Sequence, residues 1–322
     1  MIERLKNFVD SNLSACKILV VGDVMLDKYY FGEVTRISPE APVPIAHVLK
    51  VKETLGGAAN VVHNLARLGC QTSIIGQVGN DAHGDKLLQT FRERGADCSG
   101  MIETSKPTTT KIRVISGHQQ MIRLDFEDAT DLDTAATNKL LGNFSARLEA
   151  VDAVIISDYG KGVCTPRICR EVIDACRRAG KIVVVDPKGD DWQKYFGANF
   201  ITPNLKELNA VLPKKISNVD AQIESAARNV INEFNLSGLV VTRSAAGLTL
   251  IDGGKISHIK ARAQEVFDVS GAGDTVIAVF AAALAGGVDS ASAAYLANVA
   301  AGVVVAKVGT YAVARDELLS AL

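Results

Sequence analysis

The chain has 322 residues, of which 48% are hydrophobic and 22% charged, a balance that allows a sizeable buried core. Aromatic residues make up only 5% and the net charge is −1, so neither a stacking surface nor a basic field for nucleic acid is expected. The most apolar stretch, around residues 276–288, is too short and too interrupted by glycine to span a bilayer. We expect a globular protein that binds neither nucleic acid nor membrane.

The first residues, MIERLKNFVDSNLSACK, show an amphipathic helical pattern rather than a signal peptide, because no continuous apolar stretch follows the charges. The six cysteines include no CxxC pair, which favours free thiols in a reducing compartment. The five histidines form no HExxH or HxH motif, so a metal site built only from protein ligands is not expected. These features predict a cytoplasmic protein.

Short apolar runs alternate with helical patterns along most of the chain. Strands are expected at 17–23, 72–79, 153–158, 181–186, 200–202 and 238–242. Helices are expected at 58–69, 81–95, 165–179, 191–197, 204–211, 220–235, 272–286 and 289–307. This alternation indicates βαβ units, and hence one α/β domain over residues 1–322 with a mainly parallel central sheet and helices on both faces.

Two stretches depart from this rhythm. Residues 43–54 alternate polar and apolar side chains, and residues 108–127 are typical of a β-hairpin, with Gly117 and His118 near its turn. Together they predict a small inserted sheet, over about 28–54 and 108–127, with one exposed face. Because such a sheet needs its other face covered, we expect a lid over a substrate and a homodimer joined through the lid sheets.

The strongest motif is DVSGAGDT at residues 268–275, at the start of a predicted helix. The amides of Gly271, Ala272 and Gly273 can converge on an anion there, where the helix dipole is positive. Asp274 follows in the first turn. A carboxylate beside a phosphate site repels the ligand, and is tolerated when it accepts a proton from an attacking hydroxyl. The same spacing also fits a glycine-rich turn in which Asp274 only stabilises the helix.

A second set of polar residues follows two other strands. Asn204 and Glu207 are three residues apart, which suits Mg²⁺ bound largely through water and equally suits a helix capping box. In VDPKG, Asp186 could support the metal and Lys188 could reach a phosphate, unless this segment is a plain turn. Both roles can coexist in Asn204 and Glu207.

The acceptor side is predicted near the first strand. Asp23 and Asp27 lie four residues apart, and carboxylates bind sugar hydroxyls well, although a solvated turn and a structural aspartate remain alternatives. Gly56 and Gly57 allow close backbone approach, and Asn60 supplies an amide.

These motifs resemble the signatures of the PfkB carbohydrate kinases, a ribokinase-like family. DVSGAGD is similar to the second signature, D-[TV]-[ST]-G-A-G-D, and GGAAN (56–60) with GQVGNDAHG (76–84) is similar to the first signature region. The match covers nearly the whole chain in the family's order. It implies ATP as phosphoryl donor, Mg²⁺ near Asn204 and Glu207, and Asp274 as catalytic base beside the glycine amides. A monovalent cation is a further candidate cofactor.

The resemblance also implies residues that bind the nucleotide. VTRSAAG (241–247) is similar to the family's V-T-x-G-x-x-G, which places Thr242, Ser244 and Gly247 at ATP together with Lys188. Ser244 stands where the family has its first glycine, so the contact made by Ser244 stays open. The helix that contains Asn298 is implied beside the adenine, and the acceptor-side residues are implied at the sugar.

Within the family, the stretches at 25–44 and 157–162, with VDPKG and TPNLKE, resemble the heptose 7-phosphate kinases. This implies phosphorylation of the anomeric 1-hydroxyl of D-glycero-β-D-manno-heptose 7-phosphate, in the ADP-heptose pathway to lipopolysaccharide. In many bacteria such kinases are fused to an adenylyltransferase with an HxGH motif. This sequence contains no HxGH, so a separate protein is expected to supply that step.

A phosphorylated sugar requires cations near the acceptor site. We expect Arg123 and Lys161 to bind the substrate phosphate and Asp158 to contact the sugar, although each basic residue would also suit a solvated face. The alternatives are a kinase of the same family that acts on ribose, fructose, a nucleoside or tagatose phosphate, and a non-catalytic sugar-binding regulator. A nicotinamide dehydrogenase is disfavoured, because no GxGxxG follows the first strand.

Overall fold

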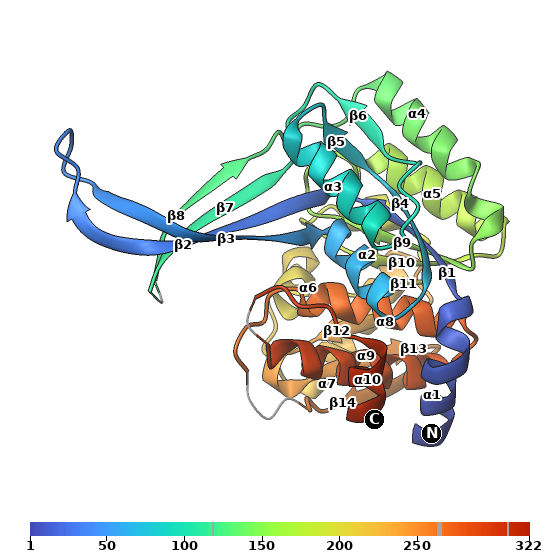
Figure 1. Ribbon diagram of the computed structural model, residues 1–322. Helices are drawn as coiled ribbons and strands as arrows, with labels where there is room; N and C mark the ends of the chain where they lie inside the picture. The colour runs from blue at the N-terminus through green and yellow to red at the C-terminus, as the bar shows by residue number, and fades with distance from the viewer. Residues whose placement is uncertain (118, 263–265, 308) are drawn as a thin grey trace.

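A computed structural model describes residues 1–117, 119–262, 266–307 and 309–322. In these ranges the chain forms an eight-stranded central sheet with strand order β14-β13-β12-β11-β10-β9-β1-β4 (Figure 1). The strands are β1 (Lys17–Gly22), β4 (Gln71–Ile75), β9 (Ala153–Ser157), β10 (Ile182–Asp186), β11 (Phe200–Ile201), β12 (Gly238–Thr242), β13 (Leu248–Asp252) and β14 (Lys255–Ile259). The strands from β4 to β12 pair in parallel, and β13 and β14 add an antiparallel edge. The mainly parallel sheet is confirmed.

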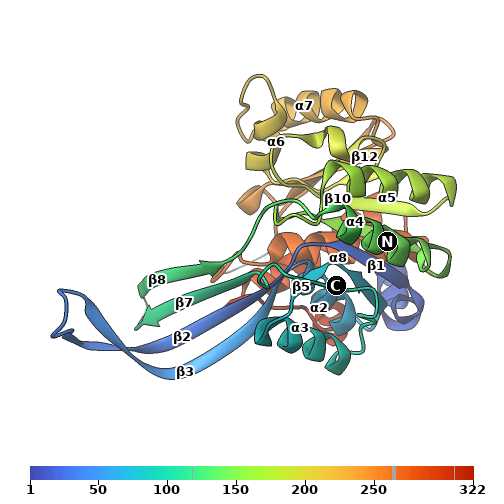
Figure 2. The ribbon, with the colours of Figure 1, turned by 90° about the horizontal axis from the view of Figure 1, so that it is seen from above.

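The central strands are apolar throughout because both faces of the sheet are covered. Along β1, Ile18 and Val20 enter one core cluster, whereas Leu19 and Val21 enter a second cluster on the other face. The first cluster is completed by α1 (Ile2–Asn7), α2 (Ala58–Arg67), α3 (Ala82–Glu93), α8 (Ala272–Ala285), α9 (Ser290–Val305) and α10 (Arg315–Ala321). The second is completed by α4 (Thr134–Ser145), α5 (Pro166–Arg178), α6 (Leu205–Val211) and α7 (Asp220–Glu233). Figure 2 shows α5 and α7 across the sheet from α2 and α3.

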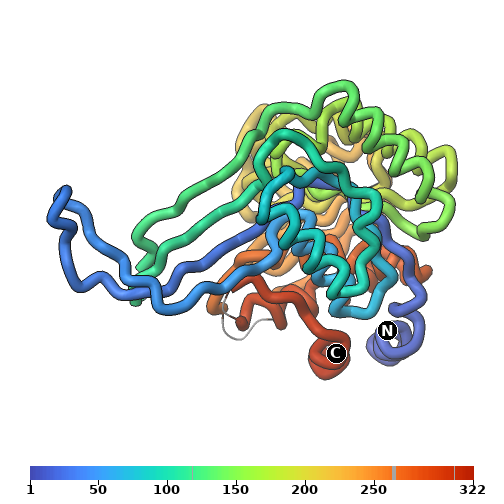
Figure 3. The backbone as a smooth tube through the Cα atoms, turned by 45° about the horizontal axis from the view of Figure 1, so that its top comes forward, coloured from blue at the N-terminus to red at the C-terminus, as the bar shows by residue number. Residues whose placement is uncertain are grey.

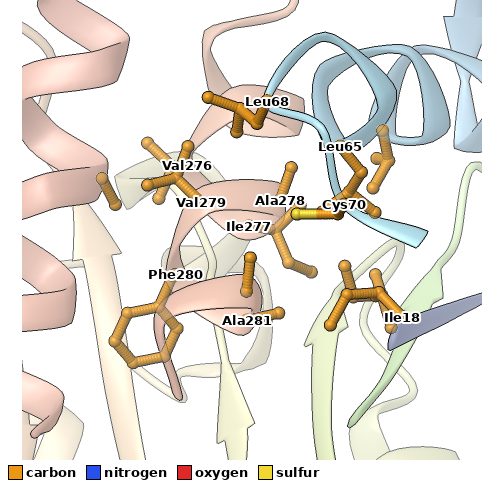
Figure 4. Packing of buried hydrophobic residues seen from close by; sticks show 14 of the residues in the cluster. Ile18, Leu65, Leu68, Cys70, Val276, Ile277, Ala278, Val279, Phe280 and Ala281 are labelled. Carbon is orange, nitrogen blue, oxygen red and sulfur yellow. The ribbon is translucent and has the colours of Figure 1, made fainter. Parts of the chain in front are cut away.

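Helix α8 is buried almost all round. Its residues Ile277 and Phe280 are fully buried and pack with Leu65 of α2 and Ile18 of β1 in one cluster (Figure 4). A helix with apolar residues on every side belongs in a core, so α8 has little freedom to move. Within the described residues, no helix is long and apolar enough to cross a bilayer.

Two predicted elements are wrong and several were missed. The strand expected at 72–79 divides at Gly76, where a Cβ would lie 2.5 Å from the Gly22 carbonyl. The second part, β5 (Gln77–Gly79), pairs with β6 (Ile102–Thr104) in a separate sheet. The helix expected at 191–197 is only the 3₁₀ turn η4 (Trp192–Tyr195). The missed elements are α4, α10, β6, β13 and β14. The remaining segments are the π-helical η1 (Phe8–Asn12) and the 3₁₀ turns η2 (Leu13–Ala15), η3 (Leu148–Ala150) and η5 (Ser244–Ala246).

A second, four-stranded sheet projects from the body, and we call it the lid (Figures 1 and 3). Its strands are β2 (Val24–Ile37), β3 (Pro44–Gly57), β7 (Thr110–Ser116) and β8 (Gln119–Phe126), in the order β3-β2-β7-β8. The inserted sheet is thus present, although β2 begins at Val24, ahead of the expected boundary at 28. His118, expected near the hairpin turn, lies outside the described residues.

The two faces of the lid differ in polarity. One row across the strands consists of Val51, Tyr30, Val114 and Ile122, and the adjacent row on the opposite face consists of Lys52, Tyr29, Arg113 and Arg123. The exposed large apolar residues of the first face are Val48, Val51, Ile122, Leu124 and Phe126. The polar face carries Asp27, whose charge acts on Asp274 of α8.

Candidate active site

Asp274 is buried in the first turn of α8, and two side chains from distant parts of the chain bind its carboxyl group. The Asn60 side chain of α2 donates a hydrogen bond of 2.7 Å to Oδ2. The Tyr159 hydroxyl, in the turn after β9, donates one of 2.5 Å to Oδ1. The structure therefore brings together the predicted Asn60 and Asp274, which lie 214 positions apart.

A buried ladder of polar groups holds this arrangement between α2 and α8. The Thr275 hydroxyl donates to Oδ1 of Asn64 at 2.9 Å, and the Asn64 side chain donates to the Asn60 carbonyl at 2.9 Å. Since α2 and α8 pack into the same core, these bonds fix the position of Asn60 beside the Asp274 carboxyl group. The sequence interpretation missed Asn64 and Tyr159. Asn64 follows Asn60 by one helical turn, a spacing that could have indicated it.

The environment of Asp274 suits a group that gains and loses a proton near neutrality. Burial raises the pKa of Asp274 to about 6, against the hydrogen bonds from Asn60 and Tyr159, which lower it, while the charge of Asp27 raises it further. The carboxyl group is therefore largely ionised at pH 7 and is still basic enough to accept a proton.

The helix start before Asp274 offers backbone amides. Gly271 has φ of +80°, a left-handed conformation that favours glycine. The Ala272 amide already donates to the Val269 carbonyl at 3.2 Å, which differs from its predicted role in an anion site. Among the described residues, the amides of Gly271 and Gly273 have no hydrogen-bond acceptor, so two of the three predicted amides are available to an anion.

Asp23 is engaged in holding the turn after β9. Its buried carboxylate accepts hydrogen bonds from the amides of Tyr159, Lys161 and Val163 at 2.9–3.0 Å. Burial raises the pKa of Asp23, and the charge of Asp158 raises it further, against these three bonds. This side chain supports the turn, and its predicted contact with a sugar stays a prediction.

Asp158 is likewise occupied by neighbouring groups. Its carboxylate is fully buried, pairs with Lys194 at 2.5 Å and accepts hydrogen bonds from the Tyr195 hydroxyl and the Gly160 amide. The predicted sugar contact is therefore not evident for this side chain.

Asp27 lies at the base of the lid and does face the site. Oδ1 of Asp27 accepts a bond of 2.5 Å from Arg113 of β7. Gly56 and Gly57 lie against it and Asp23, since a Cβ at Gly56 would clash with the Asp27 carboxylate and one at Gly57 would lie 2.5 Å from the Asp23 carbonyl. The two predicted glycines are thus required by close packing.

Basic side chains of the lid and of the body lie close to one another where the lid joins the body. Lys161 and Lys111 both pair with Glu127, at 2.8 and 3.1 Å, so two ammonium groups lie around one carboxylate. Arg123 is half-exposed on β8 and pairs with Asp125 at 2.9 Å. A dianionic ligand group would meet several cations here, and would compete with the two carboxylates for them.

The opposite side of the site contains the residues predicted to bind Mg²⁺. Asn204 and Glu207 form a reciprocal capping box, with both bonds at 2.9 Å. Burial raises the pKa of Glu207 and raises that of Asp186 well above its usual range. The charges of Asp274 and Glu207 raise the pKa of Asp186 further, and Lys188 only partly offsets them. Clustered, weakly compensated carboxyl groups of this kind fit a divalent cation.

Of the predicted nucleotide residues, Thr242 lies next to Asn204. The Thr242 amide donates to the Pro203 carbonyl at 2.9 Å, which joins the end of β12 to the start of α6. Ser244 has φ of +53°, a conformation common for glycine, which is the family's residue at this position. Gly247 has φ of +85° and packs against the Ile259 carbonyl. Asn298 is buried and donates to the Lys260 carbonyl at 2.8 Å.

Known structures share this fold across the whole chain. Arabidopsis thaliana ribokinase, solved with ribose and ATP, has a TM-score of 0.75 and 20% identity, covering 95% of this chain and 98% of that one. Escherichia coli phosphofructokinase-2, solved with potassium, has a TM-score of 0.79 and 17% identity, covering 95% and 97%. At these identities the likeness establishes the ribokinase-like fold.

Sequence relatives are closer. The bifunctional protein HldE of Paramagnetospirillum magneticum is 43% identical over 324 residues, which cover 100% of this chain and 65% of that protein. HldE of Shewanella baltica is 45% identical over 307 residues, covering 95% and 63%. This chain thus spans slightly less than two thirds of the length of these relatives. The pfkB family carbohydrate kinase model matches residues 15–317. The chain belongs to the pfkB family of carbohydrate kinases.

Proposed function

We propose that this protein transfers a phosphoryl group from ATP to the anomeric 1-hydroxyl of D-glycero-β-D-manno-heptose 7-phosphate. The observation that carries the proposal is the buried Asp274, with a pKa of about 6, next to the amides of Gly271 and Gly273. The choice of sugar rests on the stretches that resemble heptose 7-phosphate kinases and on the HldE relatives at 43% identity. The use of ATP and a sugar phosphate fits a cytoplasmic location.

The reaction needs alignment and charge stabilisation more than covalent chemistry. The sugar hydroxyl donates its proton to a lone pair of the Asp274 carboxylate as its oxygen bonds to the γ-phosphorus of ATP, and the bond from that phosphorus to the bridging oxygen breaks, so that ADP leaves. The Gly271 and Gly273 amides bind the oxygens of the group in transfer, where negative charge develops. Thr242, Ser244, Gly247 and Asn298 belong to the side that receives the nucleotide, with Lys188 near its phosphates.

Asp186, Asn204 and Glu207 would hold Mg²⁺, largely through water, because burial and mutual repulsion leave the negative charge of Asp186 and Glu207 poorly compensated. When bound, the ion neutralises charge on the ATP phosphates. A monovalent cation remains a further candidate, for which activity with potassium and with sodium is the direct comparison.

Asp274→Asn tests the role of the base. The variant keeps the shape of the side chain but cannot accept the proton, so we expect kcat to fall by about 10²–10⁴-fold while ATP binding persists. Release of ADP is measured with heptose 7-phosphate, and ATP affinity by calorimetry. Turnover close to the wild-type rate would contradict the assignment.

The identity of the sugar is tested separately with the wild-type enzyme. A panel of heptose 7-phosphate, unphosphorylated heptose, ribose, fructose and tagatose phosphate is compared by kcat/KM. The highest value is expected for heptose 7-phosphate. A higher value for another sugar would reject the substrate and leave the kinase chemistry intact.

A further inference from the structure

Tyr159 has no role in the motifs discussed above, yet it touches the base directly. Its hydroxyl donates a hydrogen bond of 2.5 Å to Oδ1 of Asp274. Its backbone amide donates to Oδ2 of Asp23 at 2.9 Å, within the turn that Asp23 holds. The tyrosine is thus fixed at both ends, by a structural aspartate at the main chain and by Asp274 at the hydroxyl.

The phenol stays protonated, so it acts only as a donor toward Asp274. Burial raises the pKa of Tyr159 well above its ordinary value, and the charges of Asp274, Asp186 and Glu207 raise it further. A neutral phenol has one proton to share, and here that proton is directed at the carboxylate.

Asn60 and Tyr159 together restrain the carboxyl group of Asp274, because each binds a different oxygen. One donor alone would leave the group free to turn about that contact. A carboxylate oxygen has two acceptor positions, so each oxygen keeps one for an incoming hydroxyl. Both donors stabilise the charged form and oppose burial.

We propose that Tyr159 is a positioning residue for the catalytic base: its hydroxyl directs the Asp274 carboxylate toward the acceptor hydroxyl and keeps it ionised near neutral pH. The inference rests on the proposed function, because it requires Asp274 to accept the proton. Tyr159 itself transfers no proton in the reaction.

The variant Tyr159→Phe removes this donor and keeps the ring that packs against Gly57. Without the hydroxyl, the charged form of Asp274 loses one of its two side-chain donors. The acid limb of the pH profile of kcat/KM is then expected to move up by about one pH unit, so activity falls more at pH 6 than at pH 8. The other charged groups that face Asp274 are Asp27 of β2 and Asp186 of β10, and both are retained.

Two readouts separate this effect from titration of the substrate, since a phosphate monoester also has a pKa of about 6. The first is the difference in acid-limb position between the variant and the wild type. Titration of the substrate is the same for both enzymes and cancels in this difference. The second is a ¹³C NMR titration of the Asp274 carboxyl carbon in the enzyme without substrate, assigned by loss of its signal in Asp274→Asn. The same upward shift is expected there.

Tyr195→Phe is the matched control. The Tyr195 hydroxyl donates to Oδ2 of Asp158 at 2.6 Å and supports the same turn without a hydrogen bond to Asp274. The acid limb of the kcat/KM profile of Tyr195→Phe is expected to coincide with that of the wild type. Fluorotyrosine at position 159, a stronger donor that preserves the fold, should shift the limb downward.

The inference is overturned if Tyr159→Phe has the same acid limb and the same carboxyl titration as the wild type. It is also overturned if fluorotyrosine at position 159 leaves the acid limb unshifted. The proposed function would survive either result as long as Asp274→Asn loses turnover. If Asp274→Asn remained active, the function itself would fail, so the two failures are distinguishable.

Discussion

Three buried aspartates near the ends of the sheet strands show that burial alone does not define a catalytic group. Asp23 and Asp158 accept hydrogen bonds from loop amides, and Asp158 also pairs with Lys194, so both carboxylates support the fold. Asp274 has one side-chain donor on each oxygen and keeps positions for a ligand. The neighbours of each carboxylate, more than its depth, decide what it can do.

Binding of the substrate phosphate is also expected to depend on single residues. Lys161→Ala removes one of the two ammonium groups around Glu127, so we expect KM for heptose 7-phosphate to rise about tenfold or more with little change in kcat. Arg123→Ala should act in the same direction. Steady-state kinetics provide the measurement.

Lys181→Ala is the control for this experiment. Lys181 is also half-buried, but it lies before the first residue of β10, whereas Lys161 follows the last residue of the parallel strand β9. The Lys181 ammonium group donates a hydrogen bond of 3.3 Å to the Glu149 carbonyl. Lys181→Ala should leave KM unchanged. If Lys161→Ala and Arg123→Ala also leave KM unchanged, the phosphate lies elsewhere.

At the scale of elements, the start of α8 requires glycine for two reasons. Gly271 has a left-handed φ, and a Cβ there would lie 2.7 Å from the Asn60 side-chain nitrogen. Gly271→Ala is therefore expected to displace Asn60 from Asp274 and to lower kcat by about tenfold or more, beyond a backbone strain of about 1–2 kcal/mol. Thermal melting and kcat are measured together.

Gly287→Ala separates the two causes. Gly287 also has a left-handed φ, of +77°, after the other end of α8, but a Cβ there would meet no atom within 4 Å. It should lower stability by a similar amount and leave kcat near the wild-type value. Equal kcat in both variants would show that the Asn60 contact is unimportant.

Much of the body could be predicted from sequence, because its central strands are uniformly apolar and its helices end in glycine. Gly69 and Gly95, which close the predicted helices at 58–69 and 81–95, both have positive φ. The break at Gly76 could not be predicted, because it depends on packing against Gly22, which is remote in sequence. Strand β2 was placed too late because its first residues, Val24–Asp27, are buried and lack alternation.

The site was only partly predictable for a related reason. The glycines and Asp274 form a contiguous motif, whereas the partners of Asp274 come from α2 and from the turn after β9. The roles of Asp23 and Asp158 depend on backbone amides and on Lys194, which no spacing rule indicates. The contiguous motif could be predicted from the sequence, whereas the side-chain contacts between distant segments could be found only from the fold.

At the scale of the whole molecule, the lid leaves one apolar face uncovered. A second copy of the chain is the occupant we propose, because exposed apolar residues of strands β3 and β8 lie on this one face and the other face carries Asp27. Ile122→Asp is expected to convert a dimer of 34.1 kDa subunits into monomers. Light scattering after gel filtration measures the mass.

Val219→Asp is the control, since Val219 lies on the body at the start of α7 and is 51% exposed, against 50% for Ile122. It should remain dimeric. A wild-type monomer at micromolar concentration, or a dimeric Ile122→Asp, would contradict the arrangement.

The ladder between α2 and α8 also has a consequence for biosynthesis. Asn60 emerges from the ribosome early, but its partner Asp274 is synthesised 214 residues later. In an incomplete nascent chain that lacks α8, Asn60 therefore has no Asp274 to bind and the core cluster around α8 cannot form. The side-chain contacts of Asp274 are thus completed in the same step as the hydrophobic interior.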